Sequence, residues 1–376
     1  MKYILFFLII SLVVNCSDEK ELPKQNYSIA VNINGIKDSV KAVFYNMETL
    51  QPIDSTYVID NKFKFRGFID EPSSGLIYFT NSTIEKYPTI LFWIDTTNIN
   101  IVANLKSLNV KDNATCFLRK SQISGSKLNH LVIDYKEQVD SLILNRKIAI
   151  NNSKTEQEKE LISKKYKLLQ EKNDSLFVFN NYNNYFSIKK IYDERNFRPK
   201  PFINRYYHLL NDFYKKSSKG RLIFNFLQSN IIKEGDSLKD FSGMTLNNKK
   251  ISLSNFKNKV VLLDFWTSNC PPCRKQIREE FPILLEKFKK EEFEIVSFSL
   301  DSNYELWKKA SYEDKINWIN ISDLKGFYSS IVIDYGIQLI PRTFIIDKSG
   351  IVNKSFTGYN KGLIEKELTN IFSREE

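Results

Sequence analysis

The pattern of hydrophobic and polar positions divides the chain into three regions. In residues 27–122, short apolar runs alternate with polar residues and end at turn-forming residues. Alternation with a period of two predicts β-strands, and Asp60-Asn61-Lys62 predicts a tight turn between two of them. Many short strands separated by only a few turn-forming residues predict an antiparallel β sandwich or meander. We place the strands at Tyr27–Ile33, Val40–Met47, Tyr57–Ile59, Phe63–Phe68, Gly75–Thr80, Thr89–Ile94 and Ile99–Leu105.

The second region, residues 123–232, has a helical pattern. Glycine almost disappears, and tracts rich in Lys, Glu and Leu, such as Thr155–Ser175, have helical spacing. Arg198-Pro199-Lys200-Pro201 must interrupt any helix there, because proline lacks the backbone N–H of a helix interior. We therefore predict a helical connector with at least one break.

The third region, residues 233–376, alternates strands and helices. Lys259–Phe265 and Phe293–Leu300 are near-continuous apolar runs, as expected for buried parallel strands. A helix is expected from about Pro272 past Phe288. The remaining elements are a helix, two strands and a final helix, expected at Tyr304–Ala310, Arg342–Asp347, Ile351–Thr357 and Lys361–Phe372. This order is typical of an α/β domain of the thioredoxin type.

The N-terminus has the pattern of an export signal. Lys2 precedes the apolar run Tyr3–Val14, which is too short for a mature membrane span. Leu12-Val13-Val14-Asn15-Cys16 resembles a bacterial lipoprotein signal, with Val and Asn where such signals prefer Leu and a small residue. The resemblance implies a signal peptide at residues 1–15, lipidation of Cys16 and a tether at residues 16–26. The alternatives are an ordinary secretory signal or a retained anchor. We expect a membrane-anchored lipoprotein of the cell envelope that faces the periplasm or the cell surface.

Charge and cysteine content narrow the range of functions. The chain has 55 Lys and Arg against 44 Asp and Glu, a net charge of +11, but these residues are interspersed. No basic block is present, so we expect no nucleic-acid partner. The four cysteines are Cys16, Cys116, Cys270 and Cys273. Cys116 lies in an apolar run that predicts a buried thiol, with a reactive or intermolecular thiol as the alternative. Cys270 and Cys273 remain as the pair that could carry out redox chemistry.

That pair, Cys270-Pro271-Pro272-Cys273, follows a buried strand and opens a helix. Unpaired N–H groups and the dipole at a helix start favour a thiolate at Cys270. The two prolines lose no needed donor at the first helical positions. Arg274 adds positive charge nearby. The motif therefore predicts a redox-active disulfide, with Cys270 attacking a substrate disulfide and Cys273 resolving the mixed disulfide.

Two residues on the preceding strand extend the candidate site. Asp264 stands in an otherwise apolar run, and we predict that it takes the proton from Cys273. An ion pair with Lys259 is the alternative. Trp266 is expected to shield the motif and pack beside the substrate, or else to pack in the core. A structural zinc site needs four ligands and only one Cys pair is present, so we expect no metal and no cofactor other than the disulfide.

These motifs resemble the extracytoplasmic thioredoxin-like oxidoreductases of the TlpA/ResA type. The resemblance rests on the segment around the Cys pair, on residues 251–263 before it, and on Ile340-Pro341-Arg342-Thr343-Phe344. It implies that Pro341 is cis, lies against the Cys pair, and pairs through its backbone with an extended substrate segment. The chain departs from the family at Gln276, where a Glu is usual, and Glu280 follows one turn later. Asp264 matches the buried aspartate of thioredoxins.

The N-terminal region resembles a β-rich domain of unknown function that precedes such domains in envelope lipoproteins. The matching motifs are Asp54-Ser55-Thr56-Tyr57, residues 61–67 and Ile123-Ser124-Gly125-Ser126. The resemblance supports this domain order and says little about the substrate.

The sequence therefore predicts a thiol-disulfide oxidoreductase of the cell envelope that reduces cysteine-containing envelope proteins, apocytochromes of cytochrome c-type biogenesis among them. A membrane or periplasmic electron donor must resupply it. One alternative is a peroxiredoxin-like thiol peroxidase (AhpC/TSA-like), because Thr267 stands three residues before Cys270. The other is a binding or assembly lipoprotein in which the redox activity is secondary.

Overall fold

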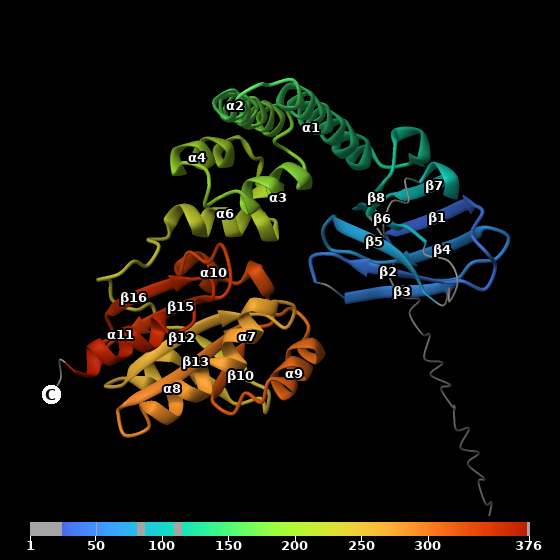
Figure 1. Ribbon diagram of the computed structural model, residues 1–376. Coiled ribbons are helices and arrows are strands. Elements are labelled where there is room, and N and C mark those ends of the chain that lie inside the picture. Colours follow the sequence, from blue (N-terminus) through green and yellow to red (C-terminus); the bar gives the residue numbers. More distant parts are fainter. Residues whose placement is uncertain (1–24, 50, 81–86, 109–114, 374–376) are drawn as a thin grey trace, which may run out of the picture.

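The computed structural model describes residues 25–49, 51–80, 87–108 and 115–373 (Figure 1). A strand-rich domain, a helical region and an α/β domain follow one another along the chain. In Figure 1 the helical region lies at the top, with the other two domains below it on opposite sides. The predicted signal peptide and Cys16 lie outside the described residues. None of the helices in the described ranges is long and apolar enough to cross a membrane.

The strand-rich domain is a sandwich of two sheets around one apolar core. The sheet orders are β4-β1-β7-β9 and β3-β2-β5-β6-β8. Neighbouring strands are antiparallel except β1–β7 and β6–β8, so the predicted antiparallel arrangement holds only in part. The strands are β1 (Tyr27–Asn34), β2 (Lys41–Asn46), β3 (Gln51–Tyr57), β4 (Lys62–Gly67), β5 (Ser73–Thr80), β6 (Thr89–Ile94), β7 (Asn98–Asn104), β8 (Thr115–Phe117) and β9 (Ile123–Ser124).

The predicted turn at Asp60-Asn61 forms, but it has a different role. Both residues have positive φ, and Ile59 and Lys62 exchange two backbone hydrogen bonds across them. The strand before the turn is β3, which ends at Tyr57, rather than the predicted Tyr57–Ile59. Since β3 and β4 belong to different sheets, the turn leads the chain from one sheet to the other.

The motif Ile123-Ser124-Gly125-Ser126 joins the strand-rich domain to the first helix. Gly125 has φ +90°, and a Cβ there would lie 1.8 Å from the carbonyl oxygen of Asn98, so only glycine fits. The Ser126 hydroxyl donates to Asp95 Oδ2 at 2.6 Å and accepts the N–H of Asn129 at 3.1 Å. Ser126 therefore caps the helix while holding it to the sheet.

The helical region is a long antiparallel hairpin followed by shorter helices. Arg198-Pro199 interrupts the helical structure as predicted, and Pro199 is the N-cap residue of α4. The core of this region includes Ile333 of the α/β domain, so the two parts pack together. The helices are α1 (Lys127–Asn151), α2 (Glu156–Asn180), α3 (Tyr185–Asp193), α4 (Lys200–Leu209), α5 (Asp212–Lys216) and α6 (Ser218–Gln228).

The α/β domain contains a seven-stranded sheet of order β11-β10-β14-β13-β12-β15-β16. Strand β12 is buried along its whole length, parallel to β13 and antiparallel to β15. Short β10, β11 and β14 were not predicted. The strands are β10 (Ser242–Thr245), β11 (Lys250–Ser252), β12 (Val260–Trp266), β13 (Phe293–Ser299), β14 (Ile319–Ser322), β15 (Arg342–Ile346) and β16 (Val352–Thr357).

Helices cover both faces of this sheet, with one apolar cluster on each side. The single helix predicted from Pro272 past Phe288 is two helices that meet at Glu280, because Pro282 cannot donate a helical hydrogen bond. The helices are α7 (Pro271–Glu279), α8 (Phe281–Lys287), α9 (Tyr304–Glu313), α10 (Ser330–Asp334) and α11 (Leu363–Phe372), with short 3-10 turns that include Gly326–Tyr328.

Candidate active site

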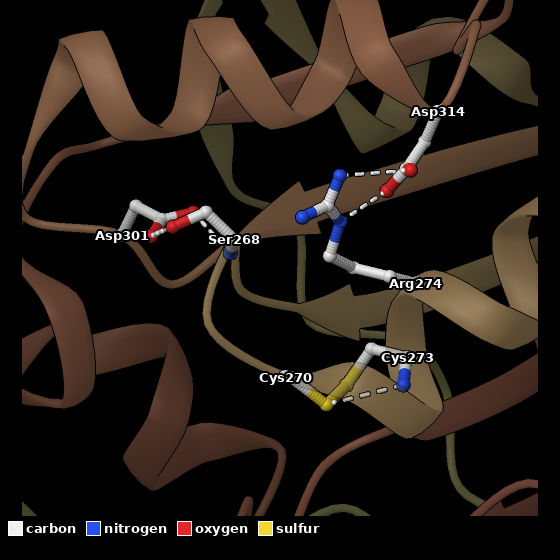
Figure 2. The surroundings of a disulfide bond; sticks show 6 residues. All are labelled: Ser268, Cys270, Cys273, Arg274, Asp301 and Asp314. Atoms are coloured by element: carbon white, nitrogen blue, oxygen red, sulfur yellow. Dashed lines mark hydrogen bonds and ion pairs between the residues drawn. A yellow bond between two sulfur atoms is a disulfide. The ribbon is translucent and has the colours of Figure 1, made fainter.

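The two cysteines lie where β12 gives way to α7, as the motif predicted. Cys270 is the N-cap residue of α7, and Pro271 and Pro272 occupy its first turn. Cys270 and Cys273 are joined by a disulfide, with their Cα atoms 5.3 Å apart (Figure 2). The backbone N–H of Cys273 donates to Cys270 Sγ at 3.2 Å. A helix N-terminus thus directs a hydrogen-bond donor at the sulfur that would carry the thiolate.

The two cysteine residues differ in exposure. Cys270 is 7% exposed and Cys273 is 1% exposed. Cys270 is therefore the residue of the pair that a substrate disulfide can approach more easily. This difference supports the assignment of attack to Cys270 and of resolution to Cys273.

Asp264 lies on the sheet face that carries the cysteines. Its neighbours at alternate positions of β12, Leu262 and Trp266, belong to the same apolar cluster as the Cys pair. Asp264 is 1% exposed and accepts a hydrogen bond from the Ser297 hydroxyl at 3.2 Å. Burial raises the pKa of the Asp264 carboxyl to about 8, although the Ser297 hydrogen bond acts in the opposite direction. The carboxyl can therefore gain or lose a proton near neutral pH.

The alternative ion pair of Asp264 with Lys259 is wrong. Lys259 Nζ instead bonds Glu294 Oε2 at 3.0 Å, at the far end of β12. Asp264 has no ion pair among the described residues, which leaves its charge uncompensated when it ionises.

Trp266 supports the motif from inside the domain. It is completely buried, and its indole N–H donates to Asn320 Oδ1 at 3.3 Å. Because no part of the ring is exposed, the structure agrees with the core-packing alternative rather than with contact to a substrate. Trp266 packs in the same cluster as the two cysteines.

Arg274 points away from the disulfide (Figure 2). Its guanidinium donates to Asp314 at 2.6 and 2.9 Å and to Glu313 at 2.8 Å. Burial alone would raise the pKa of Asp314, but hydrogen bonds from Arg274 and Arg278 hold it below its usual value. The positive charge expected to favour the thiolate is thus balanced by carboxylates, and Arg274 anchors α7 to the end of α9.

A second anchor, which the sequence did not reveal, holds the loop before the cysteines. Asp301, just after β13, accepts the Ser268 backbone N–H at 2.9 Å and the Ser268 hydroxyl at 2.6 Å. Ser299 also donates to Asp301. The available signal was an acidic residue directly after a buried strand, where functional side chains of open sheets collect.

The loop at Pro341 lies beside the end of β12. The Ile340–Pro341 peptide bond is cis, as the resemblance implied. Arg342 pairs with Phe265 in the sheet, and Ile340 packs against the cluster that contains the Cys pair. The Pro341 carbonyl accepts the N–H of Gly358 at 2.8 Å.

A buried carboxylate, Glu280, lies at the junction of α7 and α8, one turn beyond the position usual in the family. Gln276 Nε2 donates to Glu280 Oε2 at 3.4 Å, and the N–H of Gly362 donates to Glu280 Oε1 at 3.0 Å. Burial raises the pKa of Glu280 despite these hydrogen bonds. Gln276 therefore lies along α7 between the turn that contains Cys273 and this carboxyl group.

Two remaining expectations concern Cys116 and metal ions. Cys116 lies on β8 in the core of the strand-rich domain and is 6% exposed, as the buried-thiol interpretation predicted. Within the described ranges, no group of three or more His, Cys, Asp and Glu side chains has the arrangement needed to hold a metal ion.

Comparison with known proteins supports the interpretation of this Cys pair as a redox-active disulfide. Residues 233–371 match the Redoxin family, and residues 27–132 match a domain of unknown function (DUF4369). The chain is 33% identical to the thioredoxin-like protein YneN of Bacillus subtilis over 133 residues, which are 34% of this chain and 73% of that protein. It is 32% identical to the thiol-disulfide oxidoreductase ResA of Bacillus subtilis over 152 residues, which are 37% of this chain and 76% of that protein.

Among solved structures, the thioredoxin domain of a thiol-disulfide oxidoreductase from Bacteroides vulgatus is 28% identical. The match covers 38% of this chain and 97% of that structure's chain, with a TM-score of 0.34. The α/β domain and its Cys pair define a thioredoxin-like oxidoreductase. The chain belongs to the family of thioredoxin-like thiol-disulfide oxidoreductases that includes ResA and YneN.

Proposed function

We propose that Cys270 and Cys273 reduce disulfides in cysteine-containing proteins of the cell envelope. The observation that carries this proposal is the position of Cys270. It is the more exposed residue of the pair, it lies at the start of α7, and its sulfur accepts the N–H of Cys273. An accessible sulfur at a helix N-terminus is suited to nucleophilic attack as a thiolate.

The reaction balances in two exchange steps. The Cys270 thiolate attacks one sulfur of the substrate disulfide, forms a mixed disulfide and releases the other substrate sulfur as a thiolate. Cys273 then loses its proton to Asp264, attacks Cys270 Sγ and releases the second substrate thiolate. Two electrons pass from the cysteine pair to the substrate, and the pair ends as the disulfide found in the structure.

Asp264 is suited to this proton transfer because its pKa of about 8 lies near that of a thiol. The loop at Pro341 would align the substrate. Pro341 has no N–H and its carbonyl already accepts the N–H of Gly358, so an extended segment would pair with the backbone of Ile340 and not, as the resemblance implied, with that of Pro341.

We place the protein in the cell envelope as a lipoprotein anchored through Cys16. The support is the charged and apolar pattern of residues 1–15 and the polar tether after it. A thiol pair outside the cytoplasm needs a supply of electrons. The proposal therefore includes a membrane or periplasmic electron donor, with envelope proteins such as apocytochromes as substrates.

The test is reduction of a protein disulfide by the reduced chain without its signal peptide. The wild type and Cys116→Ser should reduce insulin at equal rates, while Cys270→Ser should be inactive. Activity that survives Cys270→Ser would refute the proposal. Turnover of hydrogen peroxide that survives Cys273→Ala but not Cys270→Ala would instead support the peroxidase alternative.

A further inference from the structure

A cleft of about 630 Å³ opens where the three parts of the chain meet. Each part contributes to its wall. The lining residues include Glu48 from the strand-rich domain, Arg195 and Asn196 from the turn after α3, and Thr267, Asn269 and Asp301 from the α/β domain. Asn269 precedes Cys270 directly and is exposed. A polypeptide whose cysteine reaches Cys270 therefore passes the mouth of this cleft.

Polar contacts, one of them a buried ion pair, connect the three parts around the cleft. Glu48 Oε2 bonds Lys219 Nζ of α6 at 2.6 Å, and these side chains are only 11% and 4% exposed. Lys219 Nζ also lies 5.0 Å from the centre of the Tyr328 ring in the α/β domain. The neighbouring Thr49 carbonyl accepts the Ser302 hydroxyl at 2.7 Å. These contacts link all three parts of the chain beside the cleft.

Arg195 is the unusual residue of this cleft. It is 5% exposed, and its guanidinium stacks over the Tyr192 ring at 4.0 Å. One nitrogen donates to the Tyr192 carbonyl at 2.8 Å, but the buried Nε has no hydrogen-bond partner. Burial lowers the pKa of the guanidinium, although the nearby Tyr192, Asp193 and Tyr328 act in the opposite direction. A buried cation without an ion pair is costly, and a carboxylate that binds the free donors would lower that cost.

The other charged side chains of the cleft each have an ion pair or a hydrogen bond, although Glu48 Oε1 is itself buried without a partner. Glu48 pairs with Lys219, and Lys189 pairs with Asp193. Asp301 accepts hydrogen bonds from Ser268 and Ser299. Within the described part of the chain, Arg195 has no ion pair. It is therefore the cation of the cleft that is available to bind an added anion.

We propose that this cleft binds the segment next to the reactive cysteine of a protein substrate, an inference that rests on the proposed function. An aspartate or glutamate of that segment pairs with Arg195. A peptide suits the site better than a small anion because the cleft extends to Asn269, beside Cys270. The side-chain amides of Asn196 and Asn269 can also bind a peptide backbone. The strand-rich domain then takes part in choosing the substrate.

The experiment uses disulfide-bonded peptides of one sequence, with a single Glu or Gln placed in turn two to six residues on either side of the cysteine. The reduced wild type should prefer the Glu peptide over its Gln partner at one or more positions, by about tenfold in kcat/KM, the effect of one charged hydrogen bond. Arg195→Gln should abolish the preference while still reducing the Gln peptide. Arg195→Lys should retain part of it.

Arg198→Gln is the matched control, because it removes a guanidinium from the same region that pairs with Glu194 and does not line the cleft. It should keep the wild-type preference. Equal kcat/KM for every Glu and Gln pair, or a preference that persists in Arg195→Gln, would overturn the inference. If Arg195→Gln does not fold, the wild-type comparison and Arg195→Lys decide. Failure of the wild type to reduce any peptide or insulin would instead refute the proposed function.

Discussion

The backbone N–H of Cys273 points at the sulfur of Cys270, 3.2 Å away, at the first turn of α7. In the proposed reaction the second cysteine would contribute twice: its amide would stabilise the attacking thiolate, and its own sulfur would displace the substrate. The two contributions can be separated, because a serine at position 273 keeps the amide and loses the sulfur.

Cys273→Ser should therefore still attack a disulfide but fail to release it. We expect a stable mixed disulfide between Cys270 and a substrate peptide, which non-reducing mass spectrometry would detect in stoichiometric amount. Cys270→Ser should form none. A mixed disulfide at Cys273 in the Cys270→Ser variant would reverse the assigned roles.

Asp264→Asn tests the proton acceptor. Loss of general-base assistance should slow the release of the mixed disulfide about a hundredfold, with little effect on its formation. Stopped-flow measurement of both steps at pH 7 would separate them. An equal slowing of the two steps would mean that Asp264 only supports the fold around the cysteines.

Asp264 also makes stability depend on pH. In the unfolded chain its pKa is about 3.9, and in the folded protein about 8. The folded state therefore holds a proton that the unfolded state releases, and stability falls as pH rises from about 4 to about 8. The loss should be on the order of 4 kcal/mol in urea unfolding of the oxidised wild type, between pH 5 and pH 9.

In Asp264→Asn this pH-dependent loss should be absent. Glu294→Gln is the control, since it removes a partly exposed carboxylate from the same sheet, and it should keep the wild-type dependence. A wild-type curve that is flat over this range would contradict the buried, protonated state of Asp264.

Arg274 should matter for stability more than its neighbour Arg278. Both bond Asp314, but Arg274 is the less exposed and makes two contacts to that buried carboxylate. Arg274→Gln should lower the free energy of unfolding by about 2 kcal/mol, and Arg278→Gln by less than about 1 kcal/mol. Chemical denaturation measures both. Equal losses would mean that the anchor of α7 does not depend on Arg274.

The Glu48–Lys219 pair should couple the strand-rich domain to the helical region. Each of Glu48→Gln and Lys219→Met leaves a buried partner uncompensated and should cost about 3 kcal/mol. The double variant should cost less than the sum by about 2 kcal/mol. The exposed pair Lys287–Glu365, treated in the same way, should show coupling below about 1 kcal/mol. Additive losses at Glu48 and Lys219 would show that the two domains are not coupled there.

The elements around the cysteines could be predicted because their signals are local. The apolar run of β12, the prolines at the start of α7 and the odd polar residue Asp264 all lie within ten residues of the motif. The break at Glu280 had a local signal as well, in Pro282, which the helical pattern of the surrounding residues outweighed.

The partners of those residues could not be predicted, because they come from distant segments. Arg274 meets Asp314 across 40 positions, and Ser268 meets Asp301 across 33. Short strands such as β10 and β14 have too few residues to show a period and exist through their neighbours in the sheet. The parallel pair β1–β7 likewise depends on how the sandwich closes.

The reduction potential of the Cys270–Cys273 pair tests the central claim most directly. The protein would be equilibrated with glutathione buffers of known ratio, and its dithiol fraction measured by alkylation and mass spectrometry. A reductase should give a value near that of thioredoxin, about −270 mV. A value near about −120 mV, typical of strongly oxidising exchange proteins, would contradict the assignment as a reductase.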